Sequence, residues 1–565
     1  MTERLPAPVS AAPENGLWYK DAVMYEMSVK SFYDSTGDGT GDFGGLRQKL
    51  GYLQDLGVDC IWLLPFLVSP LRDDGYDIAD YYTVHPDYGT LDDFDAMIQE
   101  AHSRGIRVIS DLVVSHVSDQ HPWFQEARRD PASPRRNWFV WADNDQKYKG
   151  VRIIFVDSEK SNWTWDPVAN QYYWHRFFSH QPDLNYDEPA VREEVRNIVR
   201  FWLKRGLDGF RVDAVPYLYE REGTTCENLP ETHAFFRDLR TMIDEEFPGR
   251  ILLAEANQWP ADVRKYFGNE DEFHMAFNFP LMPRIFIALA REARLPIVDI
   301  INQTLPIPET CAWGIFLRNH DELTLEMVTD EERDFMYHEY AKHPKMRLNL
   351  GIRRRLSPLV DDDRRVIELL HGLLFSLPGV PILYYGDELG MGDNIYLGDR
   401  NGVRTPMQWS PDRNAGFSRA DTELLYAPVV VNPNYHFESR NVEAERRLPT
   451  SLLNWVIRTI KIRHQYRHTF GRGSIRFINH PNHKALVYLR TYEDQTILCA
   501  FNLSRRPTAL EIDLSEFQGH TPIEVQSDTP FPPIGELPYF LTLGEHAFFW
   551  FRLEPPSPGA SRGSS

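Results

Sequence analysis

The chain has 565 residues, more than one hydrophobic core usually supports, so we expect a large domain with an insert or a smaller companion. Its apolar share of 42% and charged share of 25% are those of an ordinary soluble globular protein. The net charge of −21 argues against a polyanionic partner such as nucleic acid.

The start of the chain and its cysteines carry no targeting or cross-linking signal. The first residues, Met-Thr-Glu-Arg-Leu-Pro, contain no apolar run of signal-peptide length. No uncharged apolar stretch approaches the roughly 18 residues that span a bilayer, so we expect a cytoplasmic protein without a membrane partner. The cysteines lie far apart in the sequence, at Cys60, Cys226, Cys311 and Cys499. We therefore expect reduced thiols in the core, with no disulfide framework and no zinc site.

Short strand-like runs alternate with amphipathic stretches in the first part of the chain. The runs 22–32, 60–65 and 106–113 predict strands, with helices at 46–56 and 91–104 between them. This alternation predicts βαβ units and a parallel sheet. The rhythm then stops over 117–181, a stretch rich in Trp, Tyr, Asp and Pro that is too long for an ordinary loop. We expect an inserted subdomain there, after the third strand.

The alternation resumes and completes a barrel. Strands are predicted at 207–215, 250–256, 273–279, 313–319 and 380–385, and helices at 191–204, 232–247, 282–293, 364–377 and 452–466. Eight strands separated by helices predict an α/β fold of the (β/α)8 TIM-barrel class over 17–116 and 182–472. Short alternating segments such as 485–491, 496–502 and 546–552 predict a C-terminal all-β sandwich over 473–554. The Pro, Gly and Ser residues of 555–565 predict a disordered tail.

Acidic and histidine residues end several of the predicted strands. Examples are His116 after the third strand, Asp213 in the fourth, Glu255 in the fifth, and His320 with Asp321 after the seventh. Active sites of such barrels lie at the C-terminal ends of the strands. A stabilising network would not need three carboxylates and two histidines at one rim, so this gathering favours catalysis.

Arg211 and Asp213 stand two residues apart, so both side chains should point into the barrel mouth. A neighbouring guanidinium should keep Asp213 ionised, as a nucleophile requires. Glu255 follows an apolar run with no basic neighbour in sequence, so burial should raise its pKa toward that of a general acid. The Arg211 and Asp213 pair taken alone is equally well explained as a structural ion pair, and His116 alone is better explained as a structural histidine.

Enzymes that cleave glycosidic bonds use two carboxyl groups, one protonated and one ionised. The protonated group gives its proton to the leaving oxygen, and the ionised group attacks the anomeric carbon. Asp321, beside His320, fits a third role, in which it holds hydroxyl groups next to the reacting carbon as the ring becomes oxocarbenium-like.

The segments at Asp111, Gly209, Leu252 and Phe316 resemble the four signature regions of the alpha-amylase family, glycoside hydrolase family 13. Further segments resemble the members of that family that isomerise maltose to trehalose: Gln181-Pro-Asp-Leu-Asn, Tyr217-Leu-Tyr-Glu-Arg-Glu-Gly, Cys226-Glu-Asn-Leu-Pro-Glu-Thr-His, Glu255-Ala-Asn-Gln-Trp-Pro and Met275-Ala-Phe-Asn-Phe-Pro. The resemblance covers about residues 17 to 553. It implies a retaining intramolecular transglucosylation of a disaccharide, with minor hydrolysis to glucose.

The resemblance also implies the roles of individual residues. Asp213 is the expected nucleophile, Glu255 the acid/base and Asp321 the transition-state stabiliser. The residues expected to hold the substrate are Asp73, Tyr76, His116, Gln181, Arg211, His320 and Arg404. An alpha-glucosidase or another disaccharide isomerase of the family uses the same three carboxylates, and a catalytically inactive sugar-binding barrel is the alternative from another class.

A structural calcium ion is implied by the same resemblance, and no organic cofactor. The expected ligands are the side chains of Asp183 and Glu220 and the backbone carbonyls of Tyr217 and Leu218, oxygen donors that suit calcium. Ser115 stands where the family has an asparagine ligand, so the affinity is expected to be weakened. The sequence leaves the oligomeric state open, a homo-oligomer included.

Overall fold

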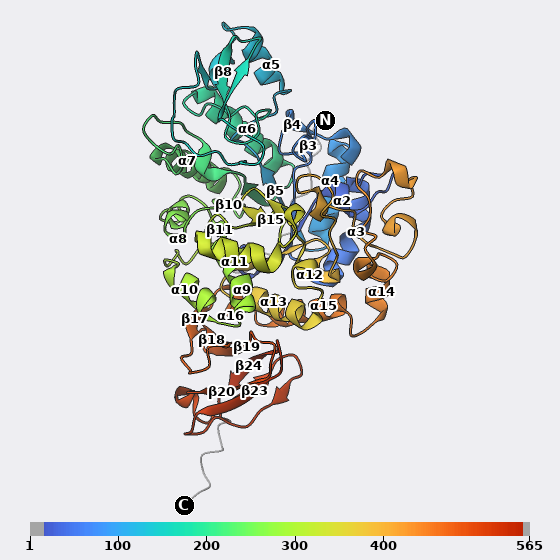
Figure 1. Cartoon of the computed structure of the whole chain (residues 1–565), viewed down its shortest axis with the longest axis vertical. Helices are drawn as coiled ribbons and strands as arrows, with labels where there is room; N and C mark the ends of the chain where they lie inside the picture. The colour runs from blue at the N-terminus through green and yellow to red at the C-terminus, as the bar shows by residue number, and fades with distance from the viewer. Residues whose placement is uncertain (1–15, 557–565) are drawn as a thin grey trace, which may run out of the picture.

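Eight parallel strands close into a barrel at the centre of the computed structural model, which describes residues 16–556 (Figure 1). In chain order they are β1 (Met24–Met27), β2 (Cys60–Leu63), β5 (Arg107–Leu112), β9 (Gly209–Val212), β10 (Ile251–Ala254), β11 (Met275–Phe277), β12 (Ala312–Phe316) and β16 (Val380–Tyr384). Met24 of β1 pairs with Cys60 of β2 on one side and with Ile382 of β16 on the other, which closes the ring. The predicted barrel class is confirmed.

The barrel strands are apolar because both of their faces are covered. Every residue of β10, Ile-Leu-Leu-Ala, is buried, as expected of a parallel strand between a filled barrel interior and a layer of helices. Arg211 of β9 departs from this pattern, since it is a charged residue only 1% exposed. A buried guanidinium needs anionic partners, so this departure marks the functional end of the barrel.

Helices cover the outside of the barrel: α3 (Phe43–Leu56), α4 (Leu91–Ser103), α6 (Pro189–Lys204), α7 (Pro230–Glu246), α9 (Leu281–Ala290), α13 (Arg364–Ser376) and α15 (Leu452–Gln465). Their ends follow local chemistry. Thr90 and Asp93 form a capping box at the start of α4, and α3 ends at Gly57 in the left-handed conformation, φ 91°. The periodicity therefore located these helices to within a few residues.

The first predicted strand is too long. β1 ends at Met27, whose partner Leu63 is the last residue of β2, and the apolar run continues as the short helix α2 (Val29–Phe32). Phe32 packs edge-on against Trp409, with ring centroids 5.0 Å apart. A continuous apolar run does not by itself distinguish a strand from a buried helical turn, so only the tertiary packing decides where the strand stops. Helices α10 (Leu295–Gln303) and α11 (Asp330–Tyr340) are also present and were not predicted.

A small subdomain interrupts the barrel between β5 and α6 and lies at the top of Figure 1. It contains α5 (Pro122–Arg129) and an antiparallel sheet of β6 (Trp141–Ala142), β8 (Gln171–Trp174) and β7 (Trp163–Asp166). Its own core includes Trp163 and Trp174. An isolated bridge between His116 and Asp183 ties its base to the end of β5, next to the barrel mouth.

The C-terminal part is antiparallel β structure, drawn in red at the bottom of Figure 1. One sheet contains β17 (Ser474–Phe477), β18 (Ala485–Tyr492), β19 (Gln495–Asn502), β24 (Phe548–Glu554), β21 (Thr521–Glu524) and β22 (Thr529–Pro530). A second pair is β20 (Thr508–Ile512) with β23 (Tyr539–Leu543). The predicted all-β character is confirmed.

Two further expectations concern the cysteines and membrane crossing. All four cysteines are buried and free of disulfide bonds. Within residues 16–556, no helix combines the length and the apolar character that crossing a bilayer requires. The predicted lack of a signal peptide concerns the first residues of the chain, and nine of the eleven positions of the predicted disordered tail are residues 557–565. Residues 1–15 and 557–565 lie outside the part of the chain that the structure describes.

Candidate active site

A pocket opens at the C-terminal ends of the barrel strands. Its lining combines acidic residues with aromatic ones: Asp73, Tyr76, His116, Ile154, Phe155, Phe177, Asp213, Ala214, Tyr217, Glu255, Asn257, Phe279, Asn319, Asp321, Glu322, Thr324, Glu326 and Arg400. The three carboxylates expected from the sequence, Asp213, Glu255 and Asp321, therefore face one cavity. The apolar walls and convergent polar groups are typical of a small-molecule site.

Arg211 joins the two carboxylates expected to carry the chemistry. Its Nη1 lies 2.7 Å from Asp213 Oδ1 and also donates to Asp111, while its Nη2 lies 2.6 Å from Glu255 Oε1. Burial alone would lower the pKa of Arg211, but the carboxylates of Asp111 and Glu255 raise it well above its ordinary value. A permanent cation is thus fixed beneath both reacting groups.

Glu255 has the protonation behaviour of an acid/base. Burial raises its pKa to about 7, with Arg211 opposing the shift and Asp213 adding to it. The direction agrees with the sequence-based expectation. Glu255 has no basic neighbour in sequence, but folding brings Arg211 from the adjacent strand against its carboxyl group. Near neutral pH the group exists in both forms, so it can donate a proton and later remove one.

Asp213 is less simply stabilised as an anion than its sequence neighbourhood suggested. Burial raises its pKa above the ordinary value, and repulsion from Asp111 adds to that rise. Arg211 lowers the pKa, as expected from the sequence, and so does a hydrogen bond with Glu255. The two reacting carboxyl groups therefore influence each other's charge, and both contact the guanidinium of Arg211.

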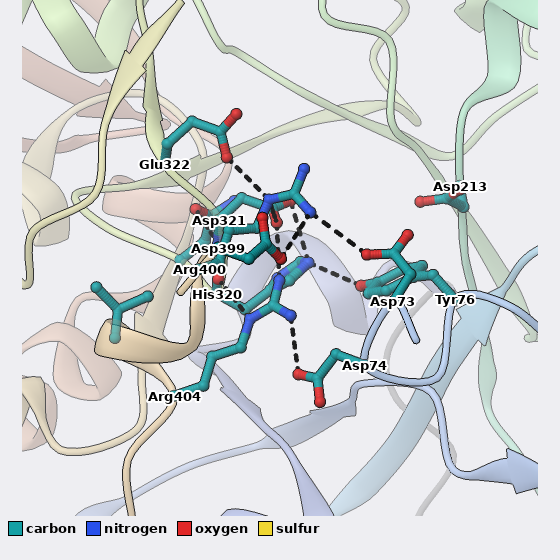
Figure 2. Close-up of polar contacts among 12 residues, drawn as sticks. Asp73, Asp74, Tyr76, Asp213, His320, Asp321, Glu322, Asp399, Arg400 and Arg404 are labelled. Atoms are coloured by element: carbon teal, nitrogen blue, oxygen red, sulfur yellow. Dashed lines mark hydrogen bonds and ion pairs between the residues drawn. The ribbon is translucent and has the colours of Figure 1, made fainter. Parts of the chain in front are cut away.

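Asp321 is surrounded by cations (Figure 2). Its Oδ1 lies 3.0 Å from Arg404 Nη2 and 3.1 Å from Arg400 Nε, and its Oδ2 lies 3.1 Å from His320 Nε2. Burial alone would raise the pKa of Asp321, but these charges lower it well below its ordinary range. Asp321 is thus a permanent anion aimed into the pocket, opposite Asp213 in the view.

Three of the seven residues expected to hold the substrate, Asp73, Tyr76 and His116, line the pocket. The other four, Gln181, Arg211, His320 and Arg404, lie behind the lining and contact the residues that form it. Gln181 is fully buried and donates from Nε2 to Asp73 Oδ2 at 2.8 Å, for example. Sequence motifs group all seven together, because a motif does not show which of two adjacent layers a side chain occupies.

The two histidines of the site differ in charge. His116 places Nε2 3.0 Å from the Tyr76 carbonyl and Nδ1 2.8 Å from Ser115 Oγ, and burial lowers its pKa to about 4. His320 stacks on Tyr76 with ring centroids 5.5 Å apart. Burial would lower the pKa of His320, but Asp321 and Glu26 raise it to about 9. At neutral pH His116 is a neutral imidazole and His320 an imidazolium.

Arg400 was missed by the sequence analysis although it lines the pocket. It lies 3.0 Å from Glu322 Oε2 and 3.4 Å from Asp73 Oδ1, in addition to its contact with Asp321, and its guanidinium carbon is 4.9 Å from the centre of the Phe155 ring. It lies four residues before Arg404, in the long loop after β16 and far from the end of that strand. The alternation of side chains along a strand identifies residues at strand ends, so it cannot identify a residue within a loop.

The insert covers part of the pocket through Ile154, Phe155 and Phe177, which we call the roof. Arg152, two residues before the roof begins, lies 2.8 Å from Glu227 Oε1, 2.8 Å from Glu326 Oε2 and 3.0 Å from the Tyr217 hydroxyl. These contacts join the insert to loops that follow two different barrel strands. The insert that carries the roof is therefore held to the barrel loops by Arg152 as well as by the bridge at its base.

The residues expected to bind calcium lie beside the site. Asp183 and Glu220 are buried, and Asp183 Oδ2 has no hydrogen-bond partner among the described residues. Burial raises the pKa of both carboxyl groups well above their ordinary values, and Asp183 adds to the rise at Glu220. Ser115 instead directs its hydroxyl to His116. No cluster of three or more His, Cys, Asp or Glu suited to a metal occurs within residues 16–556.

A hard cation such as calcium would neutralise the two carboxylates of Asp183 and Glu220 and would give the unpaired Asp183 oxygen a partner. The remaining expected ligands are the carbonyl oxygens of Tyr217 and Leu218 and the hydroxyl oxygen of Ser115. The donor set thus fits calcium.

Comparison with known proteins matches residues 27–472 to the alpha amylase catalytic domain and 475–550 to the maltogenic amylase C-terminal domain. The trehalose synthase/amylase of Mycobacterium tuberculosis is 57% identical over 98% of this chain and 94% of its own length. The trehalose synthase of Pimelobacter sp. is 56% identical over 95% and 96%. A solved trehalulose synthase of Pseudomonas mesoacidophila, as an inactive double mutant in complex with isomaltulose, superimposes with a TM-score of 0.78 at 28% identity, covering 96% of this chain and all of that one.

Proposed function

The chain belongs to the alpha-amylase family, and on that basis we propose that it converts maltose to trehalose by a retaining intramolecular transglucosylation. The first step forms a bond between Asp213 and the anomeric carbon of the nonreducing glucose. The glycosidic bond breaks as Glu255 gives its proton to the bridging oxygen. A β-glucosyl ester on Asp213 and a free glucose result.

The second step reverses these roles. The free glucose turns within the pocket, its anomeric hydroxyl attacks the ester carbon, and Glu255 takes the hydroxyl proton while Asp213 leaves. Two inversions restore the α configuration and give the α,α-1,1 linkage. Asp321, as a permanent anion, can bind hydroxyl groups whose hydrogen bonds strengthen in the oxocarbenium-like transition state.

A retaining mechanism requires the two carboxyl groups to be close, roughly 5 to 5.5 Å apart rather than the wider spacing that accommodates a water molecule. Asp213 Oδ1 lies 2.7 Å from Arg211 Nη1 and Glu255 Oε1 lies 2.6 Å from Arg211 Nη2, which supports a close spacing. The shared guanidinium of Arg211 holds both groups on one side of the cavity.

The observation that favours isomerisation over hydrolysis is the fastened roof. Arg152 links the insert to Glu227 and Glu326, and the roof side chains stand over the carboxylates. A covered pocket excludes water and retains the cleaved glucose long enough for it to reorient. A water molecule that does reach the ester gives glucose instead, so minor hydrolysis accompanies the main reaction.

The proposal is tested by incubating the purified protein with maltose and separating trehalose, glucose and isomaltose by chromatography. Trehalose as the main product is the expected result. Glucose alone would overturn the isomerase proposal and indicate an alpha-glucosidase, which uses the same three carboxylates. Unchanged maltose, with measurable binding, would indicate a sugar-binding barrel without activity.

We also propose a structural calcium ion held by Asp183, Glu220 and the carbonyls of Tyr217 and Leu218, with Ser115 or water completing the shell. Its charge would neutralise two neighbouring buried carboxylates and fix the segment that carries Tyr217 into the pocket. The reaction steps above use only side chains of the protein.

A further inference from the structure

A buried carboxylate on one of the barrel strands lies behind the active site. Glu26 of β1 is fully buried, and its Oε1 lies 2.6 Å from His320 Nδ1 and 3.0 Å from the His320 backbone nitrogen. Both of these nitrogens can donate to the same oxygen. Glu26 therefore fixes the position of His320 and the orientation of its ring.

The other ring nitrogen of His320 faces acceptors on the pocket side. Nε2 lies 3.1 Å from Asp321 Oδ2 and 2.8 Å from the Tyr76 hydroxyl oxygen. That hydroxyl also lies 3.4 Å from Asp111 Oδ2, to which it can donate, so its oxygen is free to accept from Nε2. With acceptors at both ends, the ring is suited to carry a proton on each nitrogen.

Charged and polar groups from several neighbouring elements bear on this proton. Glu26 comes from β1, Asp111 from β5, Tyr76 from the loop after β3 (Leu67–Val68), and Asp321 from the residue next in sequence. Arg404 is the opposing cation, donating from Nε to the His320 carbonyl at 2.9 Å. The acidic groups prevail, since the pKa of His320 is raised to about 9 although burial acts to lower it.

We propose that Glu26 is a positioning residue for the transglucosylation: it holds His320 as an imidazolium, and the imidazolium in turn holds Asp321 in the orientation that binds the sugar hydroxyls. The inference rests on the proposed function of the pocket. Glu26 touches neither substrate nor the reacting carboxylates, and it acts only through the ring of His320.

Replacing Glu26 by Gln removes the negative charge of the side chain but keeps its shape. In Glu26→Gln, the amide oxygen can still accept from both His320 nitrogens, so the packing of β1 is retained. The attraction for the second ring proton is lost, and Nε2 deprotonates at a lower pH. Once Nε2 has lost its proton, it can no longer donate a hydrogen bond to Asp321. The carboxylate of Asp321 is then no longer held in one orientation.

The test measures maltose binding by calorimetry from pH 6 to pH 10 in a Glu255→Gln background, which removes the titration of the acid/base. We expect the affinity of Glu255→Gln to fall near pH 9, where His320 loses its proton. In Glu26→Gln/Glu255→Gln the fall should move to lower pH by about one unit or more. In the Glu26→Gln single variant kcat should drop about tenfold or more with a smaller change in KM.

Glu388→Gln, in the same Glu255→Gln background, is the matched control. Glu388 is also fully buried and accepts hydrogen bonds from Tyr25 at 2.7 Å and Tyr52 at 2.6 Å, with no contact to the pocket lining. It should lower the melting temperature by a similar amount while leaving the pH dependence of binding in place. If Glu26→Gln does not fold, Glu26→Asp retains the charge and should preserve the binding fall near pH 9.

An unshifted pH profile in Glu26→Gln/Glu255→Gln, or an equal shift in Glu388→Gln, would overturn the role of Glu26. A Glu255→Gln chain that shows no loss of binding between pH 8 and pH 10 would do so as well. The maltose product assay decides the proposed function separately, because a wild-type chain that yields glucose alone still has a measurable pH dependence of binding.

Discussion

Arg152 Nη1 lies 2.8 Å from Glu326 Oε2, so an ion pair spans the mouth of the pocket from the insert to the loop after β12. Arg152 pairs at the same time with Glu227, which follows β9 in the chain. The roof is thus held by ion pairs between side chains of the insert and of the loops, not by hydrogen bonds between barrel strands. We expect these two ion pairs to limit how readily the roof loosens.

Removing that fastening should change the products. We expect Arg152→Gln to increase the proportion of glucose relative to trehalose several-fold, because a looser roof admits water to the glucosyl ester. Partly exposed ion pairs are worth about 1 kcal/mol or less each, so the isomerase activity should decline without disappearing. The ratio is measured by chromatography of maltose reactions. Arg135→Gln, which removes an insert pair with Glu126 at 2.9 Å, is the control, and an equal ratio in both variants would contradict the model.

Asp213→Asn should abolish trehalose formation and glucose release together. Both outcomes pass through the same ester, so each should fall by at least about a thousandfold. Arg211 keeps Asp111 and Glu255 as partners in this variant, so the melting temperature should change little. Rates from product analysis and a thermal unfolding curve check the two halves of the prediction. Survival of one activity without the other would refute a shared intermediate.

The pH dependence should reflect Glu255. Ester formation needs its protonated form, so with a pKa of about 7 the value of kcat/KM for maltose should fall about tenfold per pH unit above that pH. On the acid side, activity should also fall as Asp213, whose pKa is raised by burial, becomes protonated and loses its nucleophilicity. A nitrophenyl glucoside is a useful comparison, because its leaving group needs no proton. Its alkaline fall should be much weaker, and equal alkaline falls would contradict the acid role.

Arg400→Gln should weaken catalysis through three carboxylates at once. The guanidinium contacts Asp73, Asp321 and Glu322, and it is only 6% exposed. Leaving buried carboxylates unpaired costs several kcal/mol, so we expect kcat/KM for maltose to fall by about a hundredfold or more. Arg413→Gln is a matched control, since Arg413 forms an exposed pair with Asp421 at 3.4 Å. Comparable losses in the two variants would show that the effect is not specific to the pocket.

Calcium should raise the melting temperature if the carboxylates of Asp183 and Glu220 bind it, because an ion that binds only the folded state stabilises it by mass action. Thermal unfolding with chelator and then with added calcium measures the shift, and elemental analysis measures the bound metal. Ser115→Asn, which supplies an amide oxygen, should enlarge the shift. If neither protein responds and neither contains metal, the site is vestigial.

The sequence by itself determined the fold class of this protein and the position of three carboxylates in its pocket. Strand periodicity and the position of a polar residue at a strand end are local properties, so they identified the barrel and placed Asp213, Glu255 and Asp321 at one rim. They also indicated that burial would raise the pKa of Glu255.

Only the tertiary structure decided which charges surround those groups. Arg211 reaches Glu255 from a neighbouring strand, Glu26 reaches His320 from β1, and Arg400 reaches Asp321 from a loop about eighty positions away in sequence. The pKa of a buried group depends on every charge within a few ångströms, and sequence spacing does not report such distances. For the same reason, the sequence could not show that Gln181 and Arg404 lie behind the pocket lining while Arg400 forms part of it.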